Sequence, residues 1–173
     1  MFLNNIPSQN RDSVVLDQVE HILTTQYTPE LAKVLLSNPK ALRLSFSRKT
    51  RKLRYIYRNN QLFLAFIPTT GLFVLSLPSA QLIHEHTVSQ FPVYRVVVQN
   101  EVREFMIRGK SVFSQHVVNV DPNLRVNQEV LVVDEDDVLL ALGKLTLPPH
   151  YIIQQDVGVV VNVKKGNKAL QKK

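Results

Sequence analysis

The chain has 173 residues, of which 45% are hydrophobic and 20% charged, a composition typical of a folded globular protein rather than a disordered or fibrous one. It contains no cysteine, which excludes disulfides, thiol nucleophiles and thiolate metal sites from the chain. Twenty-one Lys and Arg against fourteen Asp and Glu give a formal net charge of +7, and an excess of this sign is the first indication of nucleic-acid binding.

Helical periodicity marks the start of the chain. Apolar residues spaced for one buried helix face follow Asp12 and Ser13, either of which can cap a helix that ends near Tyr27. Residues 28–30, Thr-Pro-Glu, provide the N-cap, the first-turn proline and the first-turn acid of a second short helix, which Asn38-Pro39 should end.

The apolar period then changes to two, which is typical of half-buried strands joined by tight turns. Strands are predicted at residues 42–46, 53–57, 62–67 and 72–75. They should form a small antiparallel meander, because the connections between them are short. A further helical segment begins at Leu77 and is ended by Phe91-Pro92, so we place a domain boundary after residue 92.

From Tyr94 the sequence is rich in valine and has turn signals at close spacing, which favours a small barrel or sandwich over a parallel sheet. The acidic run 134–137 is interpreted as a solvated hairpin turn rather than a metal site, since adjacent acids on one turn seldom converge on one ion. The expected elements are strands at 94–98, 117–120, 129–133, 138–145 and 157–163 and a short helix at 101–107.

Basic residues are concentrated in two short segments. Residues 43–58 contain seven Lys and Arg and no acid, and residues 164–173 contain five Lys and no acid. Solvated surfaces usually mix both signs, so the first segment is a candidate for phosphate binding, with a solubilising turn as the alternative. The end of the chain reads as a frayed basic tail that either contacts a ligand or is merely solvated. The candidate phosphate ligands are Arg48, Lys49, Arg51, Lys52 and Arg54.

Motifs in the second half are those of a known module. They are residues 109–114 (Gly-Lys-Ser-Val-Phe-Ser), 121–125 (Asp-Pro-Asn-Leu-Arg), 129–133 (Glu-Val-Leu-Val-Val) and 141–144 (Ala-Leu-Gly-Lys). In this order they resemble a PUA domain, the RNA-binding module of pseudouridine synthases and archaeosine transglycosylases, from Tyr94 to Lys165. Asn127 stands where the family usually has the glycine of a Pro-Gly turn, so we expect a left-handed backbone there.

Residues 42–83 in turn resemble the small α/β domain that precedes the PUA domain in archaeosine tRNA-guanine transglycosylases. The two resemblances imply an α+β chain with a pre-PUA α/β domain at 1–92, a PUA-like β-barrel at 93–165 and a basic tail at 166–173. They also imply an archaeal source. The catalytic barrel of that family, with its aspartates and cysteine-bearing zinc site, has no counterpart among these residues.

PUA domains approach RNA through the segment that corresponds to residues 108–116. Gly109 would permit close backbone approach, and Lys110 and Ser111 offer contacts to phosphate or ribose. We interpret Phe113 as a core residue rather than a base-stacking platform. The second candidate set is Arg108, Gly109, Lys110, Ser111, Gln115 and His116, the last as a polar residue at the rim.

Enzymatic motifs are missing from the sequence. It has no Walker loop, no glycine-rich dinucleotide motif and no serine elbow. His84 and His86, two residues apart on a predicted helix, point to different sides and read as surface residues. Asp17 and Glu20 share a helix face opposite its apolar stripe, where a solvated surface explains them. We therefore expect no catalysis, no cofactor and no metal.

The sequence thus predicts an RNA-binding protein that recognises structured RNA, such as tRNA, as an accessory to RNA modification, with a catalytic modification subunit as a further partner. The alternative is a protein–protein adaptor of an RNA-modification or ribosome-assembly complex. The first hypothesis requires the cations of both halves to share one surface, and the second a large apolar patch. We expect a cytoplasmic location and no membrane association, since no signal-peptide pattern or long apolar run is present.

Overall fold

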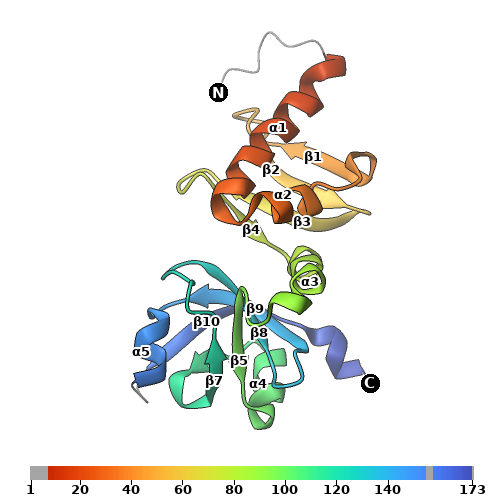
Figure 1. The fold of residues 1–173 in the computed structure, drawn as a ribbon. Coiled ribbons are helices and arrows are strands. Elements are labelled where there is room, and N and C mark those ends of the chain that lie inside the picture. The colour runs from red at the N-terminus through yellow and green to blue at the C-terminus, as the bar shows by residue number, and fades with distance from the viewer. Residues whose placement is uncertain (1–7, 155–157, 173) are drawn as a thin grey trace. The chain divides into compact units, whose positions relative to one another are not determined.

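The computed structural model describes residues 8–154 and 158–172 of the chain. The chain divides into two compact units, one ending at Ile83 and the other beginning at His84, and each is described by itself (Figure 1). Both units combine helices with sheets, so the α+β class predicted from the sequence is confirmed. The division falls inside helix α3 (Leu77–His86), and the boundary after residue 92 stays a prediction.

Helix α1 (Ser8–Gln26) opens the N-terminal unit. It begins ahead of the predicted caps Asp12 and Ser13. Its fully buried face consists of Val15, Val19 and Leu23. The predicted 3.6-residue spacing therefore identified the correct face of the helix, although the capping argument placed its start too late.

Helix α2 (Pro29–Leu35) is capped as the sequence predicts. The Thr28 hydroxyl accepts a hydrogen bond from the N–H of Leu31 at 3.3 Å. A hydrogen bond from its own backbone N–H, and then one from the Thr28 side chain, lowers the pKa of Glu30. The anionic first turn that results suits a helix N-terminus.

The four strands of the N-terminal unit form an antiparallel sheet in chain order, which confirms the predicted meander. They are β1 (Leu42–Phe46), β2 (Leu53–Arg58), β3 (Gln61–Ile67) and β4 (Leu72–Leu75). Asn59 and Asn60 connect β2 to β3 with φ angles of 49° and 62°. A pair of left-handed residues is what a two-residue hairpin turn requires, and Asn tolerates that conformation.

One face of this sheet carries the core. Leu44, Ile56, Leu64 and Leu75 are neighbours across the four strands. Ile56 and Leu64 have no exposed surface. Helices α1 and α2 lie across this face (Figure 1). The adjacent cross-strand row, Ser45, Tyr55, Ala65 and Val74, points to the opposite face, because side chains alternate in a strand.

Gln26 at the end of α1 closes the outer edge of β4. Its side-chain nitrogen Nε2 donates to the carbonyl of Phe73 at 2.9 Å, and the N–H of Phe73 donates to its oxygen Oε1 at 2.8 Å. One amide side chain therefore replaces the missing neighbouring strand at this residue. Natural proteins cover sheet edges in this way to prevent pairing with another chain.

The C-terminal unit is built on a six-stranded, nearly closed sheet in the order β6-β10-β9-β8-β5-β7. Its strands are β5 (Arg95–Val98), β6 (Val112–Phe113), β7 (Val117–Val120), β8 (Glu129–Val133), β9 (Leu139–Leu145) and β10 (Val159–Gly166). Its helices are α4 (Arg103–Ile107) and α5 (Pro149–Gln154). Short 3-10 helices complete the two units: η1 (Pro39–Ala41), η2 (Val88–Gln90), η3 (Asn100–Val102), η4 (Ser114–His116) and η5 (Lys168–Lys172).

The predicted barrel is confirmed, with differences in its elements. Strands β5 and β8 pair in parallel, a contact that a pattern of short strands does not reveal. Strand β6 and helix α5 were not predicted, because each is too short to show a period in the sequence. The last strand was predicted to start at Val157, which lies outside the described residues, whereas β10 begins at Val159 and continues to Gly166.

The guanidinium of Arg95, fully buried, ties the connecting segments of this unit to β5. Its Nε donates to Oδ1 of Asp137 at 2.7 Å. Its Nη1 donates to the Thr87 hydroxyl at 2.9 Å and to the carbonyl of Val93 at 2.8 Å. Its Nη2 donates to the carbonyl of His84 at 3.2 Å. A buried charge is tolerated here because an opposite charge and several acceptors surround it.

The acidic turn and His84 differ from their predicted solvated states. Residues 134–137 do connect β8 to β9, but the side chain of Asp134 is fully buried, with Oδ2 3.0 Å from Nη1 of Arg103. Its Oδ1 accepts the N–H groups of Asp136 and Val138 at 3.1 and 2.8 Å. His84 is half-buried, with Nε2 3.2 Å from Oδ1 of Asp137. The carboxylates of Asp134 and Asp137 lie inward because they accept hydrogen bonds from the N–H groups of the turn and from Arg95.

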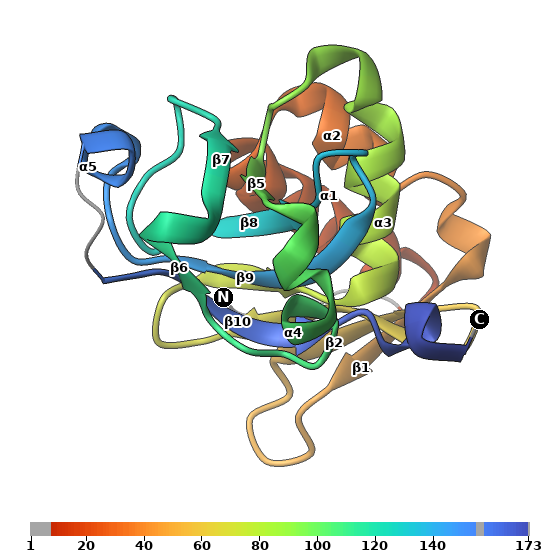
Figure 2. The same ribbon diagram turned by 90° about the horizontal axis from the view of Figure 1, so that it is seen from below.

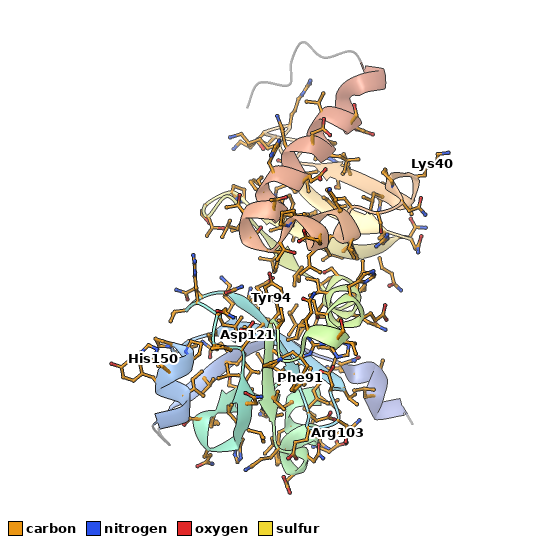
Figure 3. The ribbon with its side chains drawn as sticks, viewed as in Figure 1. Lys40, Phe91, Tyr94, Arg103, Asp121 and His150 are labelled. Atoms are coloured by element: carbon orange, nitrogen blue, oxygen red, sulfur yellow. The ribbon has the colours of Figure 1, made fainter. Side chains whose placement is uncertain are left out.

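Two residues of the PUA-like segment, Asn127 and Asp121, shape the local backbone. Asn127 is left-handed with φ 68°, as predicted for the residue that replaces glycine. Asp121 is buried and accepts the N–H of Tyr94 at 2.8 Å and the N–H of Asn123 at 2.9 Å (Figure 3). Burial, and then the neighbouring Asp121 carboxylate, raises the pKa of Tyr94. The Asp-Pro motif is thus structural. No group of three or more possible metal ligands occurs among the described residues.

Removing the Arg95 guanidinium is expected to destabilise the C-terminal unit strongly. Arg95→Met leaves Asp137 without its buried partner, which costs about 3–5 kcal/mol. Hydrogen exchange of the β9 amides should accelerate accordingly. Arg125→Met, at an exposed arginine, is the matched control. It should change the free energy of opening derived from hydrogen exchange by no more than about 0.5 kcal/mol. Equal exchange in the two variants would show that the buried ion pair contributes no net stability.

Candidate nucleic-acid interface

The basic hairpin, defined as the β1–β2 connection at residues 47–52 together with Arg54, is held by its own backbone. The N–H of Ser47 donates to the carbonyl of Lys52 at 2.8 Å, and the N–H of Arg51 donates to the carbonyl of Ser47 at 2.8 Å. The N–H of Thr50 donates to the Ser47 hydroxyl at 3.3 Å. Arg51 is left-handed, with φ 53°. The turn is therefore fixed without using the charge of any of its side chains.

The cations of the basic hairpin are exposed and uncompensated. Within the described part of the chain, no carboxylate lies within 4.0 Å of them. Their charges are thus available to an outside anion. The structure brings together on this one element the first predicted set: Arg48, Lys49, Arg51, Lys52 and Arg54.

Two other cations of the run 43–58 have structural contacts. Arg58 donates through Nη2 to the carbonyl and the hydroxyl of Ser37, at 2.6 and 2.9 Å, and so joins β2 to the end of α2. The Arg43 guanidinium lies 4.3 Å from the centre of the Tyr57 ring. Sequence pattern alone cannot separate such cations from the free ones, because the difference depends on which neighbour the fold supplies.

The second predicted set begins where α4 ends. Gly109 has φ 86°, and its N–H donates to the carbonyl of Met106 at 2.9 Å. The N–H of Lys110 donates to the carbonyl of Phe105 at 3.0 Å. These two bonds are the Schellman arrangement that ends many helices at a left-handed glycine. The conformation of Gly109 therefore fixes where the chain carries Lys110 and Ser111.

Gly166, at the end of β10, supports this loop and is not among the predicted site residues. A side-chain Cβ at Gly166 would overlap the carbonyl of Ile107, and one at Gly109 would come within 3.9 Å of the Gly166 nitrogen. Figure 2 shows β10 beside α4. The close backbone approach at Gly166 is thus to the protein's own chain, and the close approach of RNA at Gly109 stays a prediction. A glycine ending a valine-rich strand is the signal that could have revealed it.

The other members of the second set have polar contacts of different strength. Arg108 lies 3.7 Å from Glu104 with both side chains 64% exposed, so solvent and salt weaken the pair. Nε2 of Gln115 lies 3.1 Å from Nε2 of His116, and Nδ1 of His116 lies 3.3 Å from Oε1 of Gln99. His116 is half-buried. Arg108 and Gln115 stay accessible to a ligand, whereas His116 is partly committed within the protein.

The interpretation of Phe113 as a core residue is wrong. Its side chain is 48% exposed, whereas that of Val112 is fully buried. Strand β6 contains only these two residues and lies at the edge of its sheet. Because neighbouring side chains in a strand point to opposite faces, only one of the two can enter the core. Val112 takes that place.

The start of the basic tail is folded against the barrel rather than frayed. The N–H of Asn167 donates to the carbonyl of Leu140 at 2.7 Å, and its side chain donates to the carbonyl of Leu139 at 2.9 Å. Leu170 packs against the core of the unit. Lys168 stays exposed. The two predicted sets lie in different units, so the single surface expected to join them stays a prediction.

Comparisons with known proteins agree with this architecture. Residues 94–166 match the model of the PUA domain, and residues 17–90 match that of the patch-forming domain C2 of tRNA-guanine transglycosylase. Among the described residues, no helix is long and apolar enough to cross a membrane.

Similar sequences come from archaea. The tRNA-guanine(15) transglycosylase of Methanothermobacter thermautotrophicus is 34% identical over 87% of this chain and 22% of its own length. That of Methanococcus aeolicus is 33% identical over 96% of this chain and 26% of its own length. The chain thus spans about a quarter or less of the relatives it matches.

Two solved structures share the fold. A hypothetical protein from the hyperthermophilic archaeon Pyrococcus horikoshii superposes with a TM-score of 0.67 at 18% identity, over 94% of each chain. A conserved PUA domain protein from Thermoplasma acidophilum gives 0.58 at 12% identity, over 94% of this chain and 92% of its own. Both resemblances drawn from the sequence are confirmed: residues 94–166 belong to the PUA domain family, and residues 17–90 belong to the patch-forming C2 domains of tRNA-guanine transglycosylases.

Proposed function

We propose that this chain binds structured RNA, with tRNA as the first candidate, in the service of RNA modification. The observation that carries the proposal is the basic hairpin, whose five cations lie together without a carboxylate within 4.0 Å in the described part of the chain. Its setting supports the choice of ligand, because the hairpin belongs to a domain otherwise found in enzymes named for tRNA.

The mechanism would be phosphate neutralisation. Lys and Arg side chains displace condensed counterions from the nucleic-acid backbone, and Arg can also form two parallel hydrogen bonds to one phosphate. Paired RNA hides its base edges in a deep, narrow groove, so contacts to phosphates and ribose hydroxyls would dominate. Lys110 and Ser111, oriented by the Gly109 turn, would add such contacts from the PUA domain.

Catalysis is not part of the proposed role. The relatives that match are transglycosylases. This chain corresponds to 22% of the length of one of them and 26% of another. The family models that match the chain are those of the C2 and PUA domains. We infer that the chain itself binds RNA in the cytoplasm, and that a separate catalytic subunit performs the modification.

Neutralising the basic hairpin should weaken RNA binding by roughly 10- to 100-fold. The variant is Lys49→Ala, Arg51→Asn and Lys52→Ala, with Asn chosen because position 51 is left-handed and Asn tolerates this backbone. Affinity for a tRNA transcript is measured by filter binding. The control replaces Lys33, Lys40 and Arg125, three exposed cations outside both sets, by Ala. Equal losses in the two triple variants would mean that net charge, rather than the hairpin, determines binding.

Salt dependence gives a second test. If about five phosphates are contacted, the affinity of the unaltered protein should fall by three or more decades per tenfold rise in salt. In the hairpin variant, the slope of log affinity against log salt concentration should be smaller by about 2 to 3. Titrations of the tRNA transcript between 50 and 500 mM KCl measure both values. A flat response in the unaltered protein would favour the protein–protein adaptor over an RNA-binding role.

A further inference from the structure

The face of the N-terminal sheet opposite α1 and α2 carries an unusual row of side chains. Ser45, Tyr55, Ala65 and Val74 are neighbours across β1, β2, β3 and β4. Along their strands they are adjacent to the buried row that contains Ile56 and Leu64. Because side chains alternate in a strand, they lie on the face that these helices leave uncovered.

Tyr55 is the largest side chain of this row, and part of it stays exposed. The paired residues on either side, Ser45 and Ala65, are too short to pack over an aromatic ring. The residue is 38% exposed. Aromatic residues in sheets usually gain stability from large cross-strand partners. Here both cross-strand partners of the ring are small.

Tyr57 and Arg43 support this ring from the next cross-strand row. The Tyr57 ring meets that of Tyr55 edge-on, with centres 6.2 Å apart and planes at 63°. Arg43, paired with Tyr57 across β1 and β2, places its guanidinium 4.3 Å from the Tyr57 ring centre. No carboxylate among the described residues lies within 4.0 Å of Arg43. The Tyr57 ring thus contacts both the Tyr55 ring and a positive charge.

The basic hairpin connects the same two strands. Along β2, Tyr55 follows Lys52 by three residues, about 10 Å at the rise of an extended strand. A chain of phosphates bound to the turn can therefore reach the open face. Leu62, paired with Tyr57 across β2 and β3 and 40% exposed, adds apolar surface to this face. The β1–β2 end of the face, however, carries Arg43 and the cations of the turn, with no carboxylate within 4.0 Å of them among the described residues, so a polyanion fits this end better than an apolar protein partner.

We propose that Tyr55 stacks on an unpaired base of the bound RNA, with Tyr57 and Arg43 holding the ring and drawing in the adjoining phosphate. This proposal rests on the proposed function and adds a feature to it, since the ligand would present a single-stranded segment next to a paired one. Stacking accepts any base, because every base has a π face. The open sheet face would then provide affinity without reading the sequence.

The experiment measures binding of fluorescein-labelled decauridine and of a blunt, fully paired RNA duplex by fluorescence anisotropy. Tyr55→Ala should weaken decauridine binding by about 5- to 150-fold and leave duplex binding within twofold. Tyr55→Phe keeps the ring and should bind both probes as the unaltered protein does. Tyr151→Ala removes a tyrosine that is 47% exposed in the other unit, and it serves as the matched control. Circular dichroism confirms that each variant is folded.

The outcomes separate this proposal from the one it rests on. Equal decauridine binding by Tyr55→Ala and the unaltered protein, with steep salt dependence on the tRNA transcript retained, overturns the stacking role alone. Loss of duplex binding to the same extent also overturns it, because a general effect on the sheet would then be responsible. If the unaltered protein binds the tRNA transcript but not decauridine, the stacking role alone fails; if it binds neither these probes nor the tRNA transcript, both proposals fail. If sedimentation shows a dimer that Tyr55→Ala dissociates, the face is a protein interface instead.

Discussion

The backbone of Gly166 lies against the carbonyl of Ile107 too closely for any side chain, and this contact determines the geometry of the C-terminal candidate site. It brings the end of β10 onto the end of α4, where Gly109 turns the chain in the left-handed conformation. The two glycines act at one place for different reasons. Gly166 provides space and Gly109 provides backbone freedom, and together they fix the path of Lys110 and Ser111.

Arg95 stabilises the same unit from within. A guanidinium without exposed surface is costly unless its hydrogen bonds are satisfied, and here it links a carboxylate, a hydroxyl and two carbonyls from segments that precede and follow β5. The acidic turn takes part because Asp137 supplies that carboxylate and Asp134 supplies acceptors for the turn's own N–H groups. Residues that look like solvated charges in the sequence therefore contribute to the interior.

The N-terminal unit uses a simpler design. Its sheet buries one face under two helices and leaves the other open, and a short backbone-fixed turn at one end carries uncompensated cations. Rigid placement matters for such a site, because a flexible basic loop would lose more conformational freedom on binding. The open face and the turn share β1 and β2, so a ligand held by one lies within reach of the other.

The sequence by itself determined the strands of the meander, the capped second helix, the barrel and the first group of cations, because these depend on local periodicity, on turn residues and on charge density. It did not determine which charges are free. Arg43, Arg58 and Asp137 each acquire a partner from a distant part of the chain, and Phe113 is exposed because only one residue of a two-residue edge strand can face the core. Only the tertiary structure decided these points, because each depends on contacts between residues that are far apart in the sequence.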